Sequence, residues 1–305
     1  MSFSQDVKQE IMNHVPPSGC CATAAAYGIA CFGKYFDSKG TVLHTERTSV
    51  ARYAKKVFSL AGIEGKIYVR GKEESRMYEF AVKEELQVQK LLLLFGHTGI
   101  EPSLRINSKN FCCEHCVQAF VAAAFLCSGT ITDPTKEYNL EFLSNRYSLM
   151  QDFSALLMGH GFLPKITQRR GSNVLYFKAS EQIEDMLTYM GASNASLQLM
   201  NLKVYKDIRN KANRITNCET ANIDKIVSAS GKTMAAIRYL RENDSFETLP
   251  ESLKTAAVYR EEYPDLPLKE LALQFDPPLS KSGLSHRLKK IEQAAALLME
   301  RNQNA

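Results

Sequence analysis

The segment Phe120-Val-Ala-Ala-Ala-Phe-Leu-Cys-Ser-Gly129 decides the fold, because an earlier stretch of the chain repeats its pattern. That stretch is Ala24-Ala-Ala-Tyr-Gly-Ile-Ala-Cys-Phe-Gly33, at an offset of 96 residues. Both are apolar, rich in small residues and end in glycine, the residue that most often follows a helix. Each predicts a helix whose small side chains let a second helix approach closely. The simplest use of two such helices is mutual packing at a pseudo-twofold axis.

The repeat continues downstream, where Arg47 falls on Arg146 and Gly62 on Gly161 at an offset of 99 residues. We therefore divide the first two thirds of the chain into two copies, about 20–99 and 116–195. Each copy should contain, after the small-residue helix, a short strand, an amphipathic helix, a hairpin and a closing helix. The predicted elements are strands 41–45 and 138–142, helices 49–61 and 148–159, hairpins 66–70 with 76–82 and 165–169 with 174–179, and closing helices 84–95 and 181–190.

The composition is that of an ordinary globular protein, with 45% hydrophobic and 23% charged residues in 305. This excludes a collagen, a disordered tail and a secreted miniprotein. The first residues are polar, which argues against a secretory signal. The longest apolar run, 119–127, has nine residues, whereas a bilayer needs about 20. We expect a cytoplasmic protein with no membrane segment, whose eight cysteines are reduced thiols.

The excess positive charge is concentrated in one connecting segment. The formal net charge is +5 for the chain, but +2 over residues 1–199, +4 over 200–217 and −1 over 218–305. We therefore predict a domain at 1–200, a basic linker at 201–222 and a helical domain at 223–305. The basic residues of the linker could be a solvated helix face, or they could attract phosphates without reading sequence. They are Lys203, Lys206, Arg209, Lys211 and Arg214.

The last domain ends in a pattern typical of a helix-turn-helix. A short helix is predicted from Leu268 to Phe275, and a second helix begins near Ser280 or Ser282, either of which is a good N-cap. The apolar stripe of the second helix is Leu284, Leu288, Ile291 and Ala295. Its opposite side carries Ser282, Ser285, His286, Lys289 and Lys290, with Arg287 at the flank. An ordinary surface helix is the alternative, and the Asp276-Pro-Pro278 turn departs from the tighter glycine turn of many such units.

The duplicated N-terminal pattern resembles the LAGLIDADG homing-endonuclease fold, in which two such helices pack at the domain interface and the strands form a saddle on DNA. The resemblance implies an α+β domain of this type, joined to an all-α helix-turn-helix domain. In the endonucleases the residue before the glycine is an acid that holds the catalytic metal ions. The residues at those positions here are Phe32 and Ser128, so we expect no DNA cleavage. Asp37 and Asp133, each four residues past the glycine, are the alternative acids.

The whole chain resembles the WhiA family of Gram-positive bacteria. The matching residues include Asn213-Arg214, Asn217-Cys-Glu-Thr-Ala-Asn222, Leu249-Pro250, Asp133-Pro134, Tyr138-Asn-Leu-Glu-Phe142 and Ser280-Lys-Ser-Gly-Leu-Ser-His-Arg-Leu-Lys-Lys-Ile291. The resemblance implies a degenerate LAGLIDADG domain followed by a helix-turn-helix. It also implies a DNA-binding regulator, of sporulation in filamentous relatives and of cell division and chromosome segregation elsewhere.

The cysteines offer one candidate metal motif. Cys112-Cys113-Glu-His-Cys116 has the C-x-x-C spacing of a metal knuckle, with His115 inside it. No second C-x-x-C or H-x-x-x-H lies at zinc-finger distance, and Cys20, Cys31, Cys116 and Cys127 suit small packing positions. We therefore predict no bound metal, no cofactor and no catalytic cysteine.

Three functions remain to be compared. The first is a non-catalytic regulator that binds double-stranded DNA, with Ser282, Ser285, His286 and Lys289 facing base edges and Arg287 and Lys290 facing phosphates. The DNA-contacting set also includes Ser280 and Lys281 at the helix start, with Arg169 and Arg170 as further candidate phosphate contacts. The second function is a metal-dependent nuclease. The third is an interaction module that binds another protein through the N-terminal domain. We expect the protein to be associated with the nucleoid and to have no small-molecule substrate.

Overall fold

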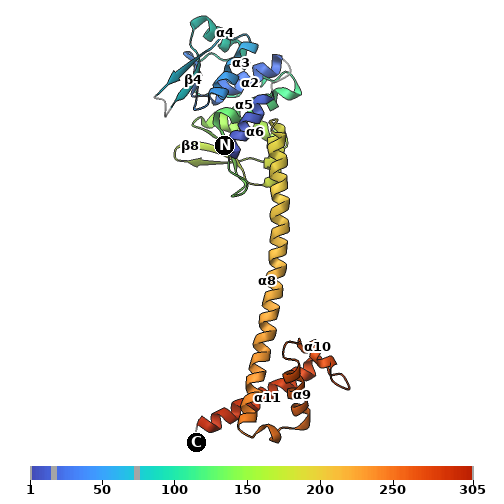
Figure 1. The fold of residues 1–305 in the computed structure, drawn as a ribbon. Helices are drawn as coiled ribbons and strands as arrows, with labels where there is room; N and C mark the ends of the chain where they lie inside the picture. Colours follow the sequence, from blue (N-terminus) through green and yellow to red (C-terminus); the bar gives the residue numbers. More distant parts are fainter. Residues whose placement is uncertain (1, 15–18, 72–75, 304–305) are drawn as a thin grey trace. The chain divides into compact units, whose positions relative to one another are not determined.

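A computed structural model describes residues 2–14, 19–71 and 76–303. Three parts of the predictions lie outside these residues: the first residue, Met1; the last residue, Ala305; and positions 72–75 of the first hairpin. The chain divides into two compact units, Met1–Lys206 and Asp207–Ala305, and the first is mixed helix and sheet while the second is helical (Figure 1). No helix within the described ranges is both long and apolar enough to cross a membrane.

The first unit contains two copies of one supersecondary pattern, preceded by α1 (Phe3–Asn13). The first copy consists of α2 (Gly19–Phe32), β1 (Tyr35–Asp37), β2 (Gly40–Thr45), α3 (Thr48–Leu60), β3 (Lys66–Arg70), β4 (Met77–Val82) and α4 (Glu85–Phe95). After the short helix η2 (Ser108–Asn110), the second copy consists of α5 (Glu114–Ser128), β5 (Gly129–Ile131), β6 (Leu140–Ser144), α6 (Tyr147–Gly159), β7 (Lys165–Arg169), β8 (Ser172–Phe177) and α7 (Ser180–Tyr189). The predicted order of elements is confirmed in both copies.

The two sheets have the same antiparallel topology, with strand orders β1-β2-β4-β3 and β5-β6-β8-β7. The strands β1 and β5 were not predicted, because three residues are too few to show an alternating pattern. The strand β6 begins two residues later than predicted, because Asn139 lies in the turn, where its carbonyl accepts the Thr132 N–H. The hairpin of the second copy turns at Arg170 and Gly171, whose φ angles are 49° and 79°. Two consecutive positive φ values are typical of a tight type I′ turn.

The helices α2 and α5 pack against each other at the centre of the first unit, as the small-residue pattern predicts. Small residues of both helices, such as Ala26 and Ala123, are fully buried. At Gly28 the approach is so close that a methyl group would lie 2.6 Å from the carbonyl oxygen of Phe120. Glycine is therefore required at this crossing for a steric reason. On the outside, α3 packs on the first sheet and α6 on the second.

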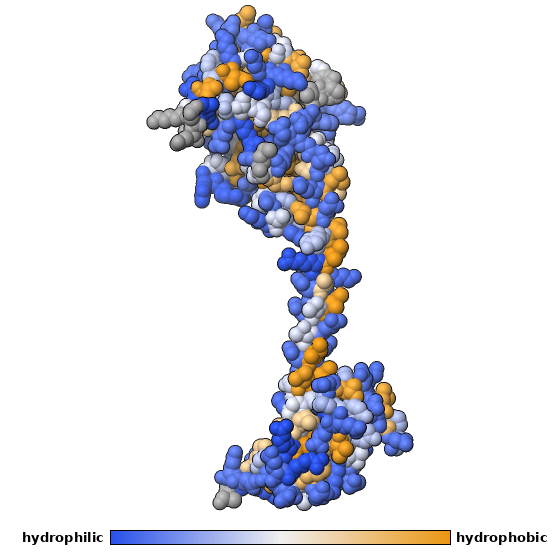
Figure 2. Space-filling model, viewed as in Figure 1, coloured by the Kyte–Doolittle hydropathy of each residue, from blue (hydrophilic) through white to orange (hydrophobic). Residues whose placement is uncertain are grey.

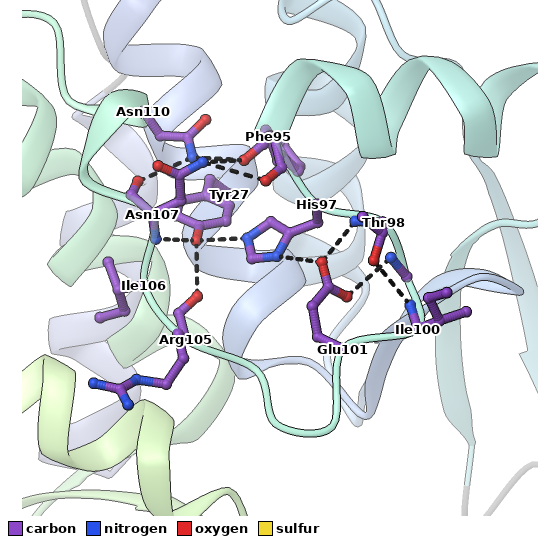
Figure 3. Close-up of polar contacts among 12 residues, drawn as sticks. Tyr27, Phe95, His97, Thr98, Ile100, Glu101, Arg105, Ile106, Asn107 and Asn110 are labelled. Carbon is purple, nitrogen blue, oxygen red and sulfur yellow. Dashed lines mark hydrogen bonds and ion pairs between the residues drawn. The ribbon is translucent and has the colours of Figure 1, made fainter.

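The connection between the two copies is fixed to α2 by the buried side chain of Tyr27 (Figure 3). The Tyr27 hydroxyl accepts the backbone N–H of Asn107 at 2.8 Å and lies 2.9 Å from His97 Nε2. His97 Nδ1 in turn lies 3.3 Å from a carboxylate oxygen of Glu101. Because burial raises the pKa of Tyr27 far above its usual value, the hydroxyl stays protonated and can hold this network.

The second unit contains α8 (Ser193–Glu242) from Asp207 onward, the short helix η3 (Phe246–Thr248), α9 (Glu251–Glu262), α10 (Leu268–Leu273) and α11 (Lys281–Gln303). The segment predicted as a basic linker, 201–222, is helical throughout and lies inside α8, and the division between the units falls at Lys206 and Asp207. The core of the second unit joins α8, α9, α10 and α11 through Ile237, Ala256, Leu271 and Leu284.

One buried arginine fixes the loop between α9 and α10. Arg260 is 3% exposed, and its Nη1 donates to the carbonyl oxygens of Tyr263, Pro264 and Leu266. Ser230 of α8 donates to the same Pro264 carbonyl at 2.6 Å. The loop that leads into α10 is therefore held by charge-assisted hydrogen bonds.

Candidate nucleic-acid interface

The helices α10 and α11 form a helix-turn-helix pair. In the turn, the Leu279 N–H donates to the carbonyl oxygen of Ala272 at 2.9 Å, which pulls the chain back onto α10. Ser280 is the N-cap of α11, because its hydroxyl oxygen accepts the Gly283 N–H at 3.0 Å. The predicted apolar stripe is buried in the core of the second unit and anchors α11; it comprises Leu284, Leu288, Ile291 and Ala295.

The opposite side of α11 is polar and basic at its amino-terminal half. The exposed residues are Ser280, Lys281, Ser282, His286, Lys289 and Lys290, and the half-buried ones are Ser285 and Arg287. Within the described ranges, no ion pair involves the lysines and arginine of this face, which are Lys281, Arg287, Lys289 and Lys290. Uncompensated cations on one helix face are suited to binding phosphate.

A groove of about 830 Å³ runs beside this helix within the second unit. Lys281, Ser285 and Lys289 of α11 line one side, and Lys225 and Lys232 of α8 line the other. The two α8 lysines were not predicted, because nothing in the local sequence pattern shows that α8 packs alongside α11. The remaining residues of the predicted set, including Ser282, His286 and Lys290, do not line the groove.

The basic segment of α8 is less available for phosphate than its charge suggests. Lys203 pairs with Glu181 and lies 3.9 Å from Glu184, and its hydrogen bond lowers the pKa of Glu181 to about 2. Lys206 donates to the carbonyl oxygen of Pro134 at 2.7 Å and lies over the Tyr138 ring. The other predicted phosphate contacts are exposed and have no ion pair within the described ranges: Arg209, Lys211 and Arg214.

Apolar side chains are also exposed along this helix (Figure 2), among them Ile208, Ile215 and Ile223. The exposed part of α8 thus carries apolar and basic groups side by side.

The hairpin arginines of the first unit are partly neutralised by acids of the same sheets. Arg169 lies 3.4 Å from Glu141. In the first copy, Arg70 lies 2.7 Å from the buried carboxylate of Glu79, which Lys83 also contacts at 2.6 Å. Arg170, in the tight turn, is exposed. The sheets therefore offer less free positive charge than their basic residues alone indicate.

The two positions that carry catalytic acids in homing endonucleases lie at the carboxyl ends of α2 and α5. Phe32 is 7% exposed, and its ring packs edge-on against Phe153 at a centroid distance of 4.9 Å. Ser128 donates its hydroxyl to the Ala124 carbonyl of its own helix at 3.0 Å. Neither side chain can serve as a carboxylate ligand for a metal ion.

Cations occupy the carboxyl ends of both helices. Arg146 donates from Nη1 to the carbonyl oxygens of Cys31 and Gly33 at 2.5 and 3.2 Å, at the end of α2. Lys8 of α1 donates to the Leu126 carbonyl at 3.2 Å, near the end of α5. Basic groups suit these positions, because the carboxyl end of a helix carries partial negative charge. A fixed guanidinium also repels a divalent cation at the place where a nuclease would hold one.

The alternative acids do not gather at a metal site. Asp37 accepts the Lys39 N–H at 2.7 Å, and Asp133 accepts both the backbone N–H and the hydroxyl of Thr135, each carboxylate thereby closing its own turn. Asp37 lines a cavity of about 440 Å³ together with Arg146 and Glu101. Within the described part of the chain, neither aspartate belongs to a group of three or more possible metal ligands.

The candidate metal knuckle, 112–116, lies close to two further cysteines, which belong to the other copy. Cys113 and Cys116 lie beside Cys20 and Cys21 of α2, whereas Cys112 is exposed and outside this group. This second pair of cysteines was not predicted, because it lies 92 or more residues away in the chain, beyond the spacing of zinc-finger ligands. The available signal was the repeat register, which already placed Cys20 on Cys116.

Comparisons with known proteins agree with this architecture. The family model of the WhiA LAGLIDADG-like domain matches residues 117–209, and that of the WhiA C-terminal HTH domain matches residues 212–295. A protein of Thermoanaerobacter pseudethanolicus named "Probable cell division protein WhiA" is 36% identical, over 99% of both chains. The chain belongs to the WhiA family. A similarly named relative from Ruminiclostridium cellulolyticum is 33% identical over 99% of this chain and 100% of its own.

A solved structure shares the WhiA fold over nearly the whole chain. It is the full-length DUF199/WhiA protein of "Thermatoga maritima", which is 20% identical, with a TM-score of 0.60 over 97% of this chain and 98% of its own. The predicted fold class is thus confirmed: a duplicated LAGLIDADG-type α+β domain followed by a helical helix-turn-helix domain. The family model of the LAGLIDADG-like domain covers the second copy, so the first copy is recognised here by its structure.

Proposed function

We propose that this protein is a non-catalytic regulator that binds double-stranded DNA through α11. The observation that carries the proposal is the exposed basic face of α11, opposite the buried stripe that anchors it. In a helix-turn-helix protein the amino-terminal half of the second helix enters the major groove. The family's HTH model matches this region of the chain. The names of the relatives support a role in cell division, and chromosome segregation and sporulation belong to the same proposal.

Within this interface we assign two kinds of contact. Ser282, Ser285, His286 and Lys289 face base edges and supply sequence discrimination. Arg287 and Lys290, with Ser280 and Lys281 at the helix start, contact phosphates and set the register on the duplex. Arg209, Lys211 and Arg214 add phosphate attraction that does not depend on sequence. Lys203, Lys206 and Arg169 contribute less, since each is already engaged within the first unit. Arg170, which is exposed in its turn, is a further phosphate contact.

We propose that the N-terminal domain, 1–200, binds another protein rather than cutting DNA. Its catalytic positions hold Phe32 and Ser128, and Arg146 occupies the carboxyl end of α2. Of its hairpin arginines, Arg70 is paired with Glu79 and Arg169 with Glu141. In this proposal the predicted linker 201–222 connects the N-terminal domain to the predicted DNA-binding domain 223–305. The protein acts in the cytoplasm, associated with the nucleoid.

The experiment is binding of the full chain to sheared genomic DNA, with sequencing of the bound fragments. We expect enrichment of a motif by the native chain and loss of that enrichment in Lys289→Ala/Lys290→Ala. Arg301→Ala is the matched control, because Arg301 is exposed on the same helix in its last turn. With Mg²⁺ present the fragments should stay intact. Cut ends would refute the non-catalytic assignment, and a native chain that enriches no fragment would refute DNA binding.

A further inference from the structure

Four cysteine side chains meet at the amino ends of the two central helices. Cys20 and Cys21 lie in the first turn of α2, Cys113 is the N-cap of α5, and Cys116 is in its first turn. Their sulfur atoms all lie within 4.8 Å of one another. Cys113 Sγ is 3.6 Å from Cys20 Sγ, 3.5 Å from Cys21 Sγ and 3.5 Å from Cys116 Sγ. We call these residues the cysteine cluster.

The spacing of the sulfur atoms fits a single tetrahedral metal ion. Zinc binds thiolates at about 2.3 Å, so the sulfur atoms of a four-thiolate site lie about 3.8 Å apart. The three distances from Cys113 are close to that edge length, and the limit of 4.8 Å includes every other pair. An iron–sulfur cluster spreads its thiolates over several iron atoms and therefore needs ligands that lie farther apart.

Burial raises the pKa of the Cys116 thiol to about 12, so a bound cation is needed to hold this buried sulfur as a thiolate. The amino end of a helix carries partial positive charge and unpaired N–H groups, and both stabilise an anionic sulfur ligand. Here α2 and α5 both present their amino ends to the four sulfur atoms. Cys21 and Cys116 are buried, so one side of the site is apolar. Packing alone explains Cys21 and Cys116, but it does not explain why Cys20 and Cys113 bring their sulfur atoms to the same place.

We propose that Cys20, Cys21, Cys113 and Cys116 bind one Zn²⁺ ion as a closed, structural four-thiolate site that joins the two copies. The ion replaces the four thiol protons, which pass to solvent, and leaves a site of net charge −2 between the two helix ends. Because all four positions are filled by protein ligands, no position is open for a substrate, and the role is structural. The site fastens α2 to α5 at the end opposite the degenerate catalytic positions.

The first test is metal analysis of the full chain purified under reducing conditions. We expect one zinc ion per chain in the native protein and in Cys218→Ser, since Cys218 lies exposed on α8. Cys112→Ser should also keep the metal, because Cys112 lies outside the cysteine cluster. Cys20→Ser and Cys116→Ser should each lose most of it. Equal zinc content in all five proteins would overturn the ligand assignment.

The second test needs no substitution, so it stands even where a serine variant fails to fold. The native chain, freed of metal and titrated with Co²⁺, should take up one equivalent. It should then show intense thiolate-to-cobalt charge-transfer bands and the visible bands of a tetrahedral four-sulfur site, and Zn²⁺ should abolish them. A reduced native chain that binds neither metal, iron with acid-labile sulfide in the isolated protein, or disulfides within the cysteine cluster would each overturn the proposal.

Discussion

The two ends of the α2–α5 pair have opposite chemistry. At the carboxyl ends lie Phe32, Ser128 and the side chains of Arg146 and Lys8, which bind the last carbonyl oxygens. At the amino ends lie the four sulfur atoms of the cysteine cluster. The difference follows from helix polarity, because carboxyl ends attract cations and amino ends attract anions. The carboxyl ends thus hold cations, and the proposed four-thiolate site places anionic sulfur at the amino ends.

The largest effect should come from restoring an acid at the carboxyl end of α2. Phe32→Asp should reduce the free energy of unfolding by about 4 kcal/mol or more, because it removes a buried ring and leaves a carboxylate among Phe120 and Phe153. Urea denaturation measures the change. Ser128→Asp is the matched control in the other copy and should cost about 1 kcal/mol or less, since Ser128 is partly exposed. Similar losses of unfolding free energy in both variants would show that the ends of α2 and α5 tolerate an acid equally well, contrary to this prediction.

Metal removal should act at the amino ends alone. A chelator should lower the unfolding free energy of the native chain by about 3–4 kcal/mol, the size expected for a ligand present at several hundred to a thousand times its dissociation constant. Differential scanning calorimetry with and without chelator measures the shift. Cys20→Ser/Cys116→Ser should begin at the lower stability and show no further shift. A chelator effect that persists in the double variant would place the metal elsewhere.

The arginine at the carboxyl end of α2 should matter less than the metal. Arg146→Met should cost about 2 kcal/mol, because three carbonyl oxygens lose a charged donor while the partly buried charge is also removed. The corresponding change at the end of α5, Lys8→Met, removes the donor of the hydrogen bond to the Leu126 carbonyl and should cost about 1 kcal/mol. Thermal unfolding of the two variants compares the ends directly, and a larger loss for Lys8→Met would reverse the ranking.

The smallest predicted effect concerns the salt dependence of DNA binding, which should depend on α11 and not on the ends of α2 and α5. In Lys289→Ala/Lys290→Ala the salt dependence of DNA affinity should flatten by about one to two units, at a cost of about 1–2 kcal/mol in binding at moderate salt. Arg146→Met should leave the salt slope unchanged. Fluorescence anisotropy over a range of salt concentrations gives both slopes. A flatter slope in Arg146→Met would mean that the carboxyl end of α2 contacts DNA.

Local sequence patterns were enough to predict the duplicated fold and the anchoring of α11. The alanine-rich segments allow few alternatives to close helix packing, and the stripe from Leu284 to Ala295 has an unbroken helical period. The strands β1 and β5 could not be predicted, since three residues carry no periodicity. The continuity of α8 was also missed, although no proline interrupts residues 193–242.

The features of the candidate sites that were missed all depend on contacts between distant segments. The cysteine cluster joins residues 92 or more positions apart, so no spacing rule for zinc ligands finds it. Arg146 reaches the end of a helix that lies in the other copy, which its own neighbours in the sequence do not indicate. Lys225 and Lys232 join the groove beside α11 only through the packing of α8. Such contacts require the fold, because they follow from how the elements assemble.

The arginine at the end of α2 also has an evolutionary consequence. Its guanidinium keeps its positive charge at any physiological pH, and it satisfies carbonyl oxygens that would otherwise lack a partner. A mutation that removes it alone loses stability, and one that restores an acid at Phe32 alone loses more. An acidic metal site at this helix end would therefore need several substitutions at once, each of which lowers stability by itself. Selection for stability alone keeps this end of the helix free of acids.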